Sequence, residues 1–552
     1  AKLRAPELVG GSRRLAGPRR LGGEEEAEQV HLGLGGPGEV VVTYLAQRRG
    51  LASEVFFAKK GMELPPEGVQ GLVTTYASFI CPREKLTHPA LGTSPAVSAE
   101  ELASLVNTSA FLPTSASAYL KLENSSEAWK KLERGCISYN NPLGYHQSPY
   151  IHTVVLKDLE PRTSYQYRLG LAGREFTFTT PPSPGSSEPD KPFRLGVWAD
   201  VGITNVSVAV MKTLLALEPE LLLLVGDYAY SDGWAARWDL FGQLAEPLMS
   251  KTATLGVPGD HEMYHGRGQG RDWMERYPVP FRPSGSESPY WYSYEAGLVH
   301  FLCIIGGYAP TGADSPQYQF VVQDLLRVNR TRTPWLVVQF HVPWYNSNTK
   351  HHLEGFKHRR DMEELFFFHG VDLIFNGHVH SYERSHPVYK EKVNRCGPIN
   401  IVVGDAGNYE GPNGIWREPQ PEWSAFREAS FGAGLLTVHN STHAEWVWTR
   451  TACVNKSSAM GYREYYAWNG ISGPEDGPPC STSGDASSSR FAASDSATIV
   501  RDPVACPSRL AGSGEGWPAR GAGAAGRPAA FTERRLAAGG PGQRRREPAR
   551  RP

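Results

Sequence analysis

Seven side chains that can bind metal ions stand at the ends of apolar runs in the middle of the chain. They are Asp200, Asp227, Tyr230, Asp260, His341, His378 and His380. Carboxylate, phenolate and imidazole groups are ligands that proteins offer to iron, zinc and manganese. Two ions need about three or four protein ligands each, with positions left for water and substrate. The residue types therefore predict a dinuclear metal centre, provided that the fold brings them together.

Each of these residues taken singly has a commoner structural explanation. Asp227 and Asp260 follow glycines, and Gly-Asp after a strand is usually a turn. Tyr230 alone suggests a half-buried aromatic with a satisfied hydroxyl, and a lone His341 suggests a packed histidine. His378 and His380 are stronger candidates, because alternate residues can face one site where an extended segment kinks. The whole ordered set, each member beside an apolar run, favours metal chemistry.

Apolar runs typical of buried strands precede the candidate ligands between about Phe193 and Thr449. The five runs are FRLGVWAD, LLLLVGD, TATLGVPGD, WLVVQFH and DLIFNGH. They alternate with amphipathic stretches such as VSVAVMKTLLAL, a pattern that predicts an α/β layered domain. Loops beyond the carboxyl ends of strands in such a sheet converge on one crevice. We therefore expect the seven side chains to meet there.

Composition divides the chain into five segments. Short alternating runs separated by Gly, Pro and Asp indicate an antiparallel β-sandwich near the N-terminus, and polar stretches without periodicity indicate disorder. The predicted segments are a disordered 1–25, a sandwich at 26–182 with a polar insert at about 63–136, a linker at 183–192, the α/β domain at 193–450, and a mostly disordered tail at 451–552.

Whole-chain numbers exclude some classes of function. The 552 residues carry a formal net charge of zero and are 40% hydrophobic, so neither a nucleic acid nor a membrane surface is implied as a partner. No run of 18 or more apolar residues is present, so no membrane-spanning helix is expected. The first 20 residues are basic without an apolar stretch, so we expect that a signal peptide, if one exists, is not in this sequence.

Six Asn-x-Ser/Thr sequons give moderate support for a secreted glycoprotein. They lie at Asn107, Asn124, Asn205, Asn329, Asn440 and Asn455. The seven cysteines include no CxxC pair, so neither a zinc knuckle nor a disulfide framework is indicated. One or two disulfides are possible, with the pairing left open.

Five motifs around the candidate ligands resemble the metallophosphoesterase blocks of the purple acid phosphatases. They are Asp200-x-Gly202, Gly226-Asp227-x-x-Tyr230, Gly259-Asp260-His261-Glu262, Val338-x-x-His341 and Gly377-His378-x-His380. Three further stretches resemble the plant-like high-molecular-weight branch of that calcineurin-like superfamily, namely PWYNSN (343–348), HSYERSHPVY (380–389) and SAFREASFG (424–432). The resemblance spans roughly Glu28 to Arg450 and weakens across the insert.

The resemblance implies a fold and a distribution of ligands. The fold would be α+β with two domains: a fibronectin-III-like β-sandwich, then a four-layer α/β metallophosphoesterase domain, with disordered termini. Fe(III) would be held by Asp200, Tyr230 and His380, and a divalent ion (Zn, Mn or Fe) by Asp260, His341 and His378, with Asp227 bridging the two. Phenolate and carboxylate are hard donors suited to Fe(III), whereas a site richer in imidazole suits a divalent ion.

The implied activity is that of an acid phosphatase that hydrolyses small phosphate monoesters by attack of a metal-bound hydroxide. His261 and the pair His351-His352 would contact the substrate and supply protons. The spacing from His341 to that pair is about one residue longer than usual, so either imidazole could face the substrate. Glu354 in the same loop is expected to be solvated. The resemblance also implies a secreted, vacuolar or cell-wall protein and allows a homodimer.

One departure from the family pattern affects the expected chemistry. The third block normally carries Asn where this chain has Asp260. A carboxylate still ligates a divalent ion, but it adds negative charge beside an incoming phosphate and removes an NH2 donor. We expect lower phosphate affinity or a changed metal preference. Two alternatives remain: a metallophosphodiesterase or nucleotide pyrophosphatase, against which Tyr230 argues, and a non-catalytic secreted glycoprotein.

Overall fold

The structure is a computed structural model, and it describes the greater part of the chain. The described residues are 27–47, 50–79, 145–231, 236–263, 270–451 and 493–506. Three predicted sequons, Asn107, Asn124 and Asn455, lie outside them, as do the predicted disordered segment 1–25 and most of the predicted insert and tail. No helix among the described residues is long and apolar enough to cross a membrane.

Two sheets near the N-terminus share one core, as the alternating runs predict. One contains β1 (Glu28–Leu34), β2 (Val40–Ala46), β8 (Tyr150–Leu156) and β5 (Leu72–Thr74), and the other contains β10 (Glu175–Thr179), β9 (Ser164–Leu169), β3 (Glu54–Lys59) and β4 (Val69–Gln70). Val42 from the first sheet and Val55 and Tyr167 from the second are fully buried in the same cluster. A short pair, β6 (Ala77–Phe79) and β7 (Tyr145–Gln147), extends from this region.

The start of the predicted insert was placed too early. β4 and β5 lie within residues 63–79, which were assigned to the insert, and β5 pairs with β8 inside the sandwich sheet. The sequence did not reveal them because the two strands have only two and three residues, too few to show an alternation.

The second half of the chain forms the predicted α/β domain. Parallel strands β11 (Phe193–Trp198), β12 (Leu221–Val225) and β13 (Thr254–Val257) adjoin antiparallel β23 (Gly432–Val438), β24 (His443–Arg450) and β25 (Ala493–Val500) in one sheet. A second sheet has the order β14 (Trp291–Ala296), β15 (Val299–Ile304), β16 (Trp335–Gln339), β17 (Leu373–Asn376), β21 (Ile399–Val403), β18 (Tyr382–Ser385) and β22 (Ser424–Glu428). Short β19 (Val388–Tyr389) pairs with β20 (Lys392–Val393).

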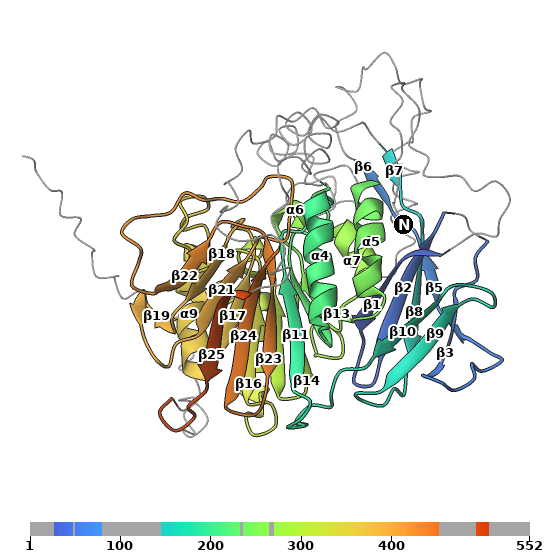
Figure 1. The fold of residues 1–552 in the computed structure, drawn as a ribbon, viewed down its shortest axis with the longest axis horizontal. Coiled ribbons are helices and arrows are strands. Elements are labelled where there is room, and N and C mark those ends of the chain that lie inside the picture. Colours follow the sequence, from blue (N-terminus) through green and yellow to red (C-terminus); the bar gives the residue numbers. More distant parts are fainter. Residues whose placement is uncertain are drawn as a thin grey trace, which may run out of the picture. The chain divides into compact units, whose positions relative to one another are not determined.

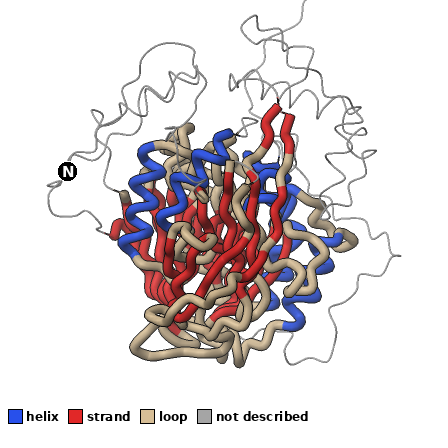
Figure 2. The backbone as a smooth tube through the Cα atoms, turned by 90° about the vertical axis from the view of Figure 1, so that its right-hand side faces the viewer, coloured by secondary structure: helices blue, strands red, loops and turns tan. Residues whose placement is uncertain are grey.

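Helices cover the outer faces of the two sheets and make four layers. α4 (Asn205–Leu217), α5 (Ala236–Met249) and α7 (Arg271–Arg276) share a buried cluster with the outer side chains of β11 and β12. α8 (Pro316–Arg327) and α9 (Phe356–His369) share another with β15, β16 and β17. Residues such as Val197, Leu223 and Val337 pack between the sheets. Figure 1 shows α4 beside α5, and Figure 2 shows the strands between helices on both flanks.

The sandwich and the α/β domain are more closely joined than a linker predicts. β1 pairs in parallel with β13 through Gly33 and Thr254, so one ten-stranded sheet runs through both. His31 on β1 also lies 2.6 Å from the Arg276 carbonyl oxygen, and the Tyr167 hydroxyl donates to the carbonyl of Ser250 at 2.7 Å. The segment at 183–192 therefore separates the sandwich from the α/β domain in the sequence, but one sheet is continuous through both.

A strand lies within the segment that was predicted to be a disordered tail. β25 pairs with β24 along its length, from His443 opposite Val500 to Thr449 opposite Ala493. Beyond it, a disulfide joins Cys506 to Cys396. The strand was missed because its inward residues include Asp495 and small Ala497 rather than a run of large apolar side chains. The tail prediction is thus wrong for residues 493–500.

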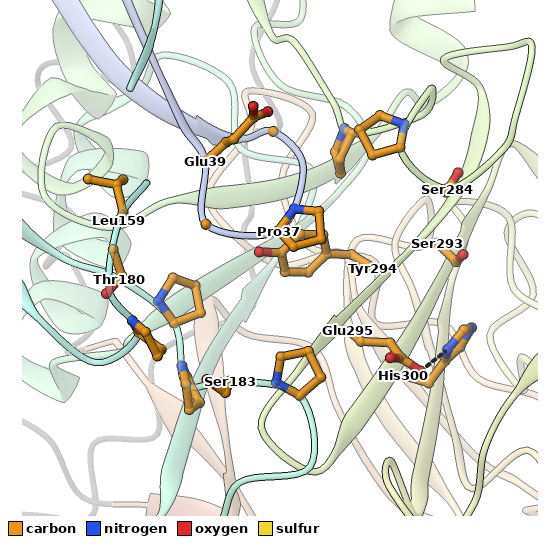
Figure 3. A pocket seen from close by; sticks show the side chains of 18 of the residues that line it. Pro37, Glu39, Leu159, Thr180, Ser183, Ser284, Ser293, Tyr294, Glu295 and His300 are labelled. Atoms are coloured by element: carbon orange, nitrogen blue, oxygen red, sulfur yellow. Dashed lines mark hydrogen bonds and ion pairs between the residues drawn. The ribbon is translucent and has the colours of Figure 1, made fainter. Parts of the chain in front are cut away.

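A cavity of about 420 Å³ lies between loops of the sandwich and strands β14 and β15. Figure 3 shows Glu39, Tyr294 and His300 among its lining residues. The His300 ring donates from Nε2 to Asp324 at 2.8 Å and from Nδ1 to Glu295 at 3.2 Å. Burial alone would lower the pKa of His300, but these two carboxylates outweigh it and raise that pKa to about 9. His300 is therefore protonated in the folded protein at neutral pH.

We expect His300 to make the free energy of unfolding depend on pH. A histidine has a pKa near 6.5 when unfolded, so the contribution of His300 is complete below pH 6.5 and is lost as pH rises through about 9. A shift of this size corresponds to roughly 3 kcal/mol. Urea unfolding at pH 6 and pH 9.5 should show this loss in the wild type and not in His300→Gln. Equal pH slopes for the two proteins would contradict the assignment.

Candidate metal centre

The seven predicted ligands follow the carboxyl ends of strands from both sheets. Asp200 follows β11, and Asp227 and Tyr230 follow β12. Asp260 opens the short helix α6 (Asp260–Met263) after β13. His341 follows β16, and His378 and His380 follow β17. Six of the seven side chains are buried, and Asp260 is half-buried.

Four of the seven residues form one compact ligand group. Asp227, Asp260, His341 and His378 each offer an atom, and these atoms all lie within 4.8 Å of one another. Nε2 of His341 is 3.0 Å from Asp227 Oδ2 and 3.2 Å from Asp260 Oδ1. Nδ1 of His378 is 2.8 Å from the same Asp260 oxygen. This group is the predicted divalent set together with the predicted bridging carboxylate.

The other three residues form a second ligand group beside the first. The Tyr230 hydroxyl donates to Asp200 Oδ1 at 3.0 Å and lies 2.9 Å from His380 Nε2. His380 Nε2 is 3.3 Å from Asp200 Oδ1. Asp200 Oδ1 is in turn 3.8 Å from His341 Nε2 in the first group. The two groups therefore adjoin, as the ligands of two neighbouring ions must.

Two buried atoms show that this donor set fits cations. Asp227 Oδ2 and His341 Nε2 face each other at 3.0 Å, but neither makes a hydrogen bond of acceptable geometry among the described residues. Buried polar atoms are rarely left in this condition. His341 Nδ1 lies 2.7 Å from the Val225 carbonyl oxygen, to which it donates. This contact fixes the tautomer and leaves Nε2 as a ligand atom.

The electrostatics of the protein groups alone also call for positive charge. Burial raises the pKa of Asp227, and the charge of Asp260 raises it further. Burial and the charges of Asp200 and Asp227 raise the pKa of Tyr230 well above its usual value. A phenolate forms there only if a bound ion supplies the compensating charge. The site as built is thus a cluster of acids that cations would stabilise.

Four of the candidate ligands have left-handed backbone conformations. The φ angles are 57° at Asp200, 54° at Asp227, 48° at Tyr230 and 69° at His378. Non-glycine residues seldom adopt such angles, and their cost is usually tolerated where function requires it. Each angle turns the chain sharply just beyond a strand, which directs the side chain into the space between the strand ends.

The glycines of the motifs are required by close approach between loops. A Cβ atom on Gly259 would lie 2.0 Å from Asp227 Oδ1, and one on Gly226 would lie 2.4 Å from His341 Nδ1. A Cβ on Gly377 would lie 2.4 Å from Asp200 Oδ2. The local sequence explains Gly-Asp only as a turn. The structure shows that the glycine is also required because a second loop approaches it closely.

Two of the three predicted catalytic histidines lie against the ligands. The His261 ring is centred 3.9 Å from that of Tyr230, and its backbone N–H donates to Asp227 Oδ1 at 3.0 Å. The His351 ring is centred 4.1 Å from that of His378. His352 instead interacts with the backbone of Asn346 and the charge of Arg417. Of the adjacent pair, the structure therefore brings His351 to the candidate site.

Glu354 is not the solvated residue that the sequence led us to expect. Although half of its side chain is exposed, Oε2 accepts from His378 Nε2 at 2.7 Å and Oε1 accepts from His351 Nδ1 at 3.0 Å. The carboxylate therefore ties the loop after His341 to a candidate ligand. The spacing of three residues between His351 and Glu354 was the only hint of this contact in the sequence. It was not sufficient, because a polar loop has no periodicity that shows which way its side chains point.

Three further residues near the site were not among the predicted site residues. Glu262 is buried and accepts from the backbone N–H groups of Asp227 and Gly259, both at 2.8 Å, and of Tyr228 at 3.0 Å. The Tyr308 hydroxyl donates to Asp260 Oδ1 at 3.1 Å. Glu410 lies 3.8 Å from His380 Nδ1 and 3.9 Å from His261 Nε2. These residues come from segments far apart in the sequence, namely α6, a short 3-10 helix (Gly306–Tyr308) and the loop that contains Glu410.

Comparison with known proteins identifies the family. Residues 194–382 match the family model of the calcineurin-like phosphoesterases, and residues 397–458 match that of the iron/zinc purple acid phosphatase-like protein C. The chain is 41% identical over 308 residues to purple acid phosphatase 18 of Arabidopsis thaliana, covering 55% of this chain and 69% of that protein. It is 37% identical over 349 residues to purple acid phosphatase 1 of Ipomoea batatas, covering 58% and 73%.

A solved structure agrees with the fold. The purple acid phosphatase from yellow lupin (Lupinus luteus) seeds superimposes with a TM-score of 0.59 at 21% identity, over 79% of this chain and 73% of that one. The α/β arrangement of two sheets and flanking helices is therefore shared with a known phosphatase. Together with the sequence relatives, these findings show that the chain belongs to the purple acid phosphatases, a family of metal-dependent phosphomonoesterases.

Proposed function

We propose that this protein is an acid phosphatase that hydrolyses small phosphate monoesters at an Fe(III)–M(II) centre, with M being Zn, Mn or Fe. The observation that carries the proposal is the pair of adjoining ligand groups at the strand ends. Bound there, the two ions would supply a hydroxide nucleophile at modest pH and neutralise the phosphoryl oxygens. The site residues would hold the ions and orient the ester.

The chemistry of the donors supports one assignment of the two ions. Asp200, Tyr230 and His380 offer a carboxylate and a phenolate and so suit Fe(III). His341 and His378 offer imidazoles and, with Asp260, suit a divalent ion. Asp227 Oδ2 lies beside His341 in the first group, and its second oxygen, Oδ1, accepts the His261 N–H, which holds the carboxylate in a fixed orientation. We assign it as the bridge.

His261 and His351 are proposed to contact the substrate. Both lie against candidate ligands without belonging to either ligand group, and imidazoles at such positions can donate to phosphate oxygens or to the leaving alkoxide. The hydrogen bond from His351 Nδ1 to Glu354 fixes the orientation of the His351 ring beside His378. His351 is therefore our choice for the proton donor.

Asp260 keeps the divalent group intact while lowering its affinity for anions. Its Oδ1 accepts a hydrogen bond from the Tyr308 hydroxyl at 3.1 Å, which offsets part of the added charge. The family's amide would instead offer an NH2 group to phosphate. We therefore retain the expectation of weaker phosphate binding or a changed divalent preference.

The relatives and the surface suggest where the protein works. One relative, 36% identical over 327 residues, is the phosphoenolpyruvate phosphatase of Allium cepa, so a small phosphate ester is the expected substrate class. Asn205, Asn329 and Asn440 are exposed and can accept glycans, which supports our proposal of a secreted or vacuolar location. We also propose a homodimer, as the family resemblance implies.

Metal analysis combined with an absorption spectrum tests the proposal. We expect one iron and one divalent ion per chain, a visible band from tyrosinate-to-iron charge transfer, and turnover of p-nitrophenyl phosphate at acidic pH. Tyr230→Phe should lose the band while keeping the fold. A colourless, iron-free protein with full activity would overturn the iron assignment. Stoichiometric metal without turnover would instead favour the non-catalytic alternative.

A further inference from the structure

Asp495 is a buried carboxylate on β25, the C-terminal strand. Its oxygens accept from Tyr382 Oη at 2.6 Å, from Arg384 Nε at 2.7 Å and from Arg384 Nη2 at 2.9 Å. The residue is 8% exposed. A bidentate, charge-assisted pair of this kind is among the stronger polar interactions in proteins and fixes the geometry of both partners. Figure 1 shows β25 beside β24 at the edge of the sheet.

Both partners of Asp495 belong to the segment that carries a candidate iron ligand. β18 begins at Tyr382, two residues after His380. The Tyr382 hydroxyl donates to Asp495 and accepts from Trp446 Nε1 at 2.7 Å, so its orientation is determined on both sides. The C-terminal strand therefore holds the first residues of β18 in place, and through them the backbone on which His380 stands.

A second path leads from the same cluster to Asp200. The Tyr382 ring stacks on that of Trp448, with centroids 4.4 Å apart and planes 6° from parallel. Trp448 Nε1 donates to Asp405 Oδ2 at 2.9 Å. Three residues further along this loop, Asn408 donates from its backbone N–H and from Nδ2 to the Asp200 carbonyl oxygen, at 3.2 and 3.1 Å. The cluster thus supports the backbone of Asp200 as well as that of His380.

We propose that Asp495 is a positioning residue for the iron side of the metal centre, which it maintains through Tyr382 and Arg384. The inference rests on the proposed function, since it assumes that His380 and Asp200 bind Fe(III). It predicts an asymmetric effect, because the described contacts lead from Asp495 to Asp200 and His380, whereas Asp260 and His341 follow other strands. His378 is the one divalent ligand on the same segment as His380. Groups that orient metal ligands typically contribute 10- to 100-fold to metal affinity or activity.

The decisive variant is Asp495→Asn in the full chain. The substitution keeps the shape but removes the charge that pairs with Arg384. We expect iron to dissociate into a chelator roughly 10 times faster, and kcat to fall by roughly 10- to 100-fold, with KM within about threefold. The visible band should shift, since the geometry at Tyr230 and His380 relaxes, and release of the divalent ion should change much less. Asp495→Glu should recover part of the loss.

A neighbouring residue supplies the matched control. Ser496 follows Asp495 on the same strand but is exposed, so Ser496→Ala should leave iron release, band position and kcat at wild-type values. If Asp495→Asn lowers the melting temperature but leaves iron release and the band unchanged, Asp495 is only structural and the proposal is wrong. Equal losses of both metals would also overturn it.

Two further outcomes separate this proposal from the proposed function. Wild-type protein that binds no iron would refute the iron centre itself. If the wild type binds iron and Asp495→Asn releases iron at the same rate, only the positioning role is refuted. If Asp495→Asn does not fold, Arg384→Lys takes its place, because lysine keeps the charge but loses the bidentate contact. If Arg384→Lys releases iron faster but the divalent ion at the wild-type rate, the proposal is supported. If it releases iron at the wild-type rate, the proposal is overturned.

Discussion

Asp227→Asn is expected to lower kcat/KM for p-nitrophenyl phosphate on the order of 10^3-fold, which corresponds to about 4 kcal/mol. Asp227 is almost fully buried, with one oxygen facing His341 Nε2 at 3.0 Å and the other accepting the His261 N–H. An asparagine of the same size keeps the packing but removes the negative charge between the two proposed ions. Because the mutual repulsion of the two ions increases when this charge is removed, at least one ion should be lost.

The measurement is metal content together with steady-state kinetics. Asp227→Asn should retain at most one ion per chain after dialysis, and its residual activity should rise when the lost metal is added in excess. Asp314→Asn is a fair comparison, since Asp314 is exposed in a surface loop and should keep both ions and full activity. If Asp227→Asn kept both ions and more than a tenth of the activity, Asp227 could not be the bridge.

The sequence predicted the candidate ligands because each follows a strand. An apolar run of five or six residues shows where a strand ends, and the carboxyl ends of parallel strands share one edge of the sheet. Asp200 and Asp227 could therefore be placed together without knowledge of the loops, whereas His341 follows a strand of the second sheet. The same logic predicted the α/β layers, since amphipathic stretches such as 205–217 must cover the apolar strands.

Loop conformation, in contrast, could not be predicted from local patterns. Whether His351 or His352 faces the site depends on a left-handed residue, because φ is 58° at His351. Glu354 and Tyr308 reach the ligands from loops whose direction no hydrophobic period records. β25 was not predicted because one of its buried positions is a carboxylate, Asp495, which pairs with Tyr382 and Arg384 far away in the sequence. In each case the determining contact is far away in sequence.

The loop before the histidine pair illustrates how such contacts shape a site. Lys350, next to His351, forms an ion pair with Glu410 at 3.5 Å, and the side chains of Asn346 and Asn348 fix the loop by bonds to the backbone of Lys350. These bonds set the angle at which His351 approaches His378. The spacing of residues in the sequence cannot give this orientation.

Gly259→Ala should disable the centre although Gly259 is not itself a ligand. Its Cβ would lie 2.0 Å from Asp227 Oδ1 and 2.8 Å from the Asp227 backbone nitrogen, well inside any tolerated contact. The φ angle of Gly259 is not in the left-handed region, so the effect comes from the added methyl group and not from backbone strain. Overpacking of this kind typically costs 1–3 kcal/mol of stability, so the fold should survive.

The predicted result for Gly259→Ala is a displaced Asp227 in an otherwise folded protein. We expect kcat/KM to fall by about 100-fold or more, since a ligand misplaced by about 1 Å can cost that much. Metal analysis should show loss of the divalent ion, whereas circular dichroism should remain native. Gly414→Ala provides the comparison, because its Cβ would meet only the Ala429 Cβ at 3.4 Å. Full activity in Gly259→Ala would mean that the loop moves to accommodate the methyl group and that close approach does not hold Asp227 in place. It would also contradict the inference that these glycines allow two strand ends to meet around metal ions.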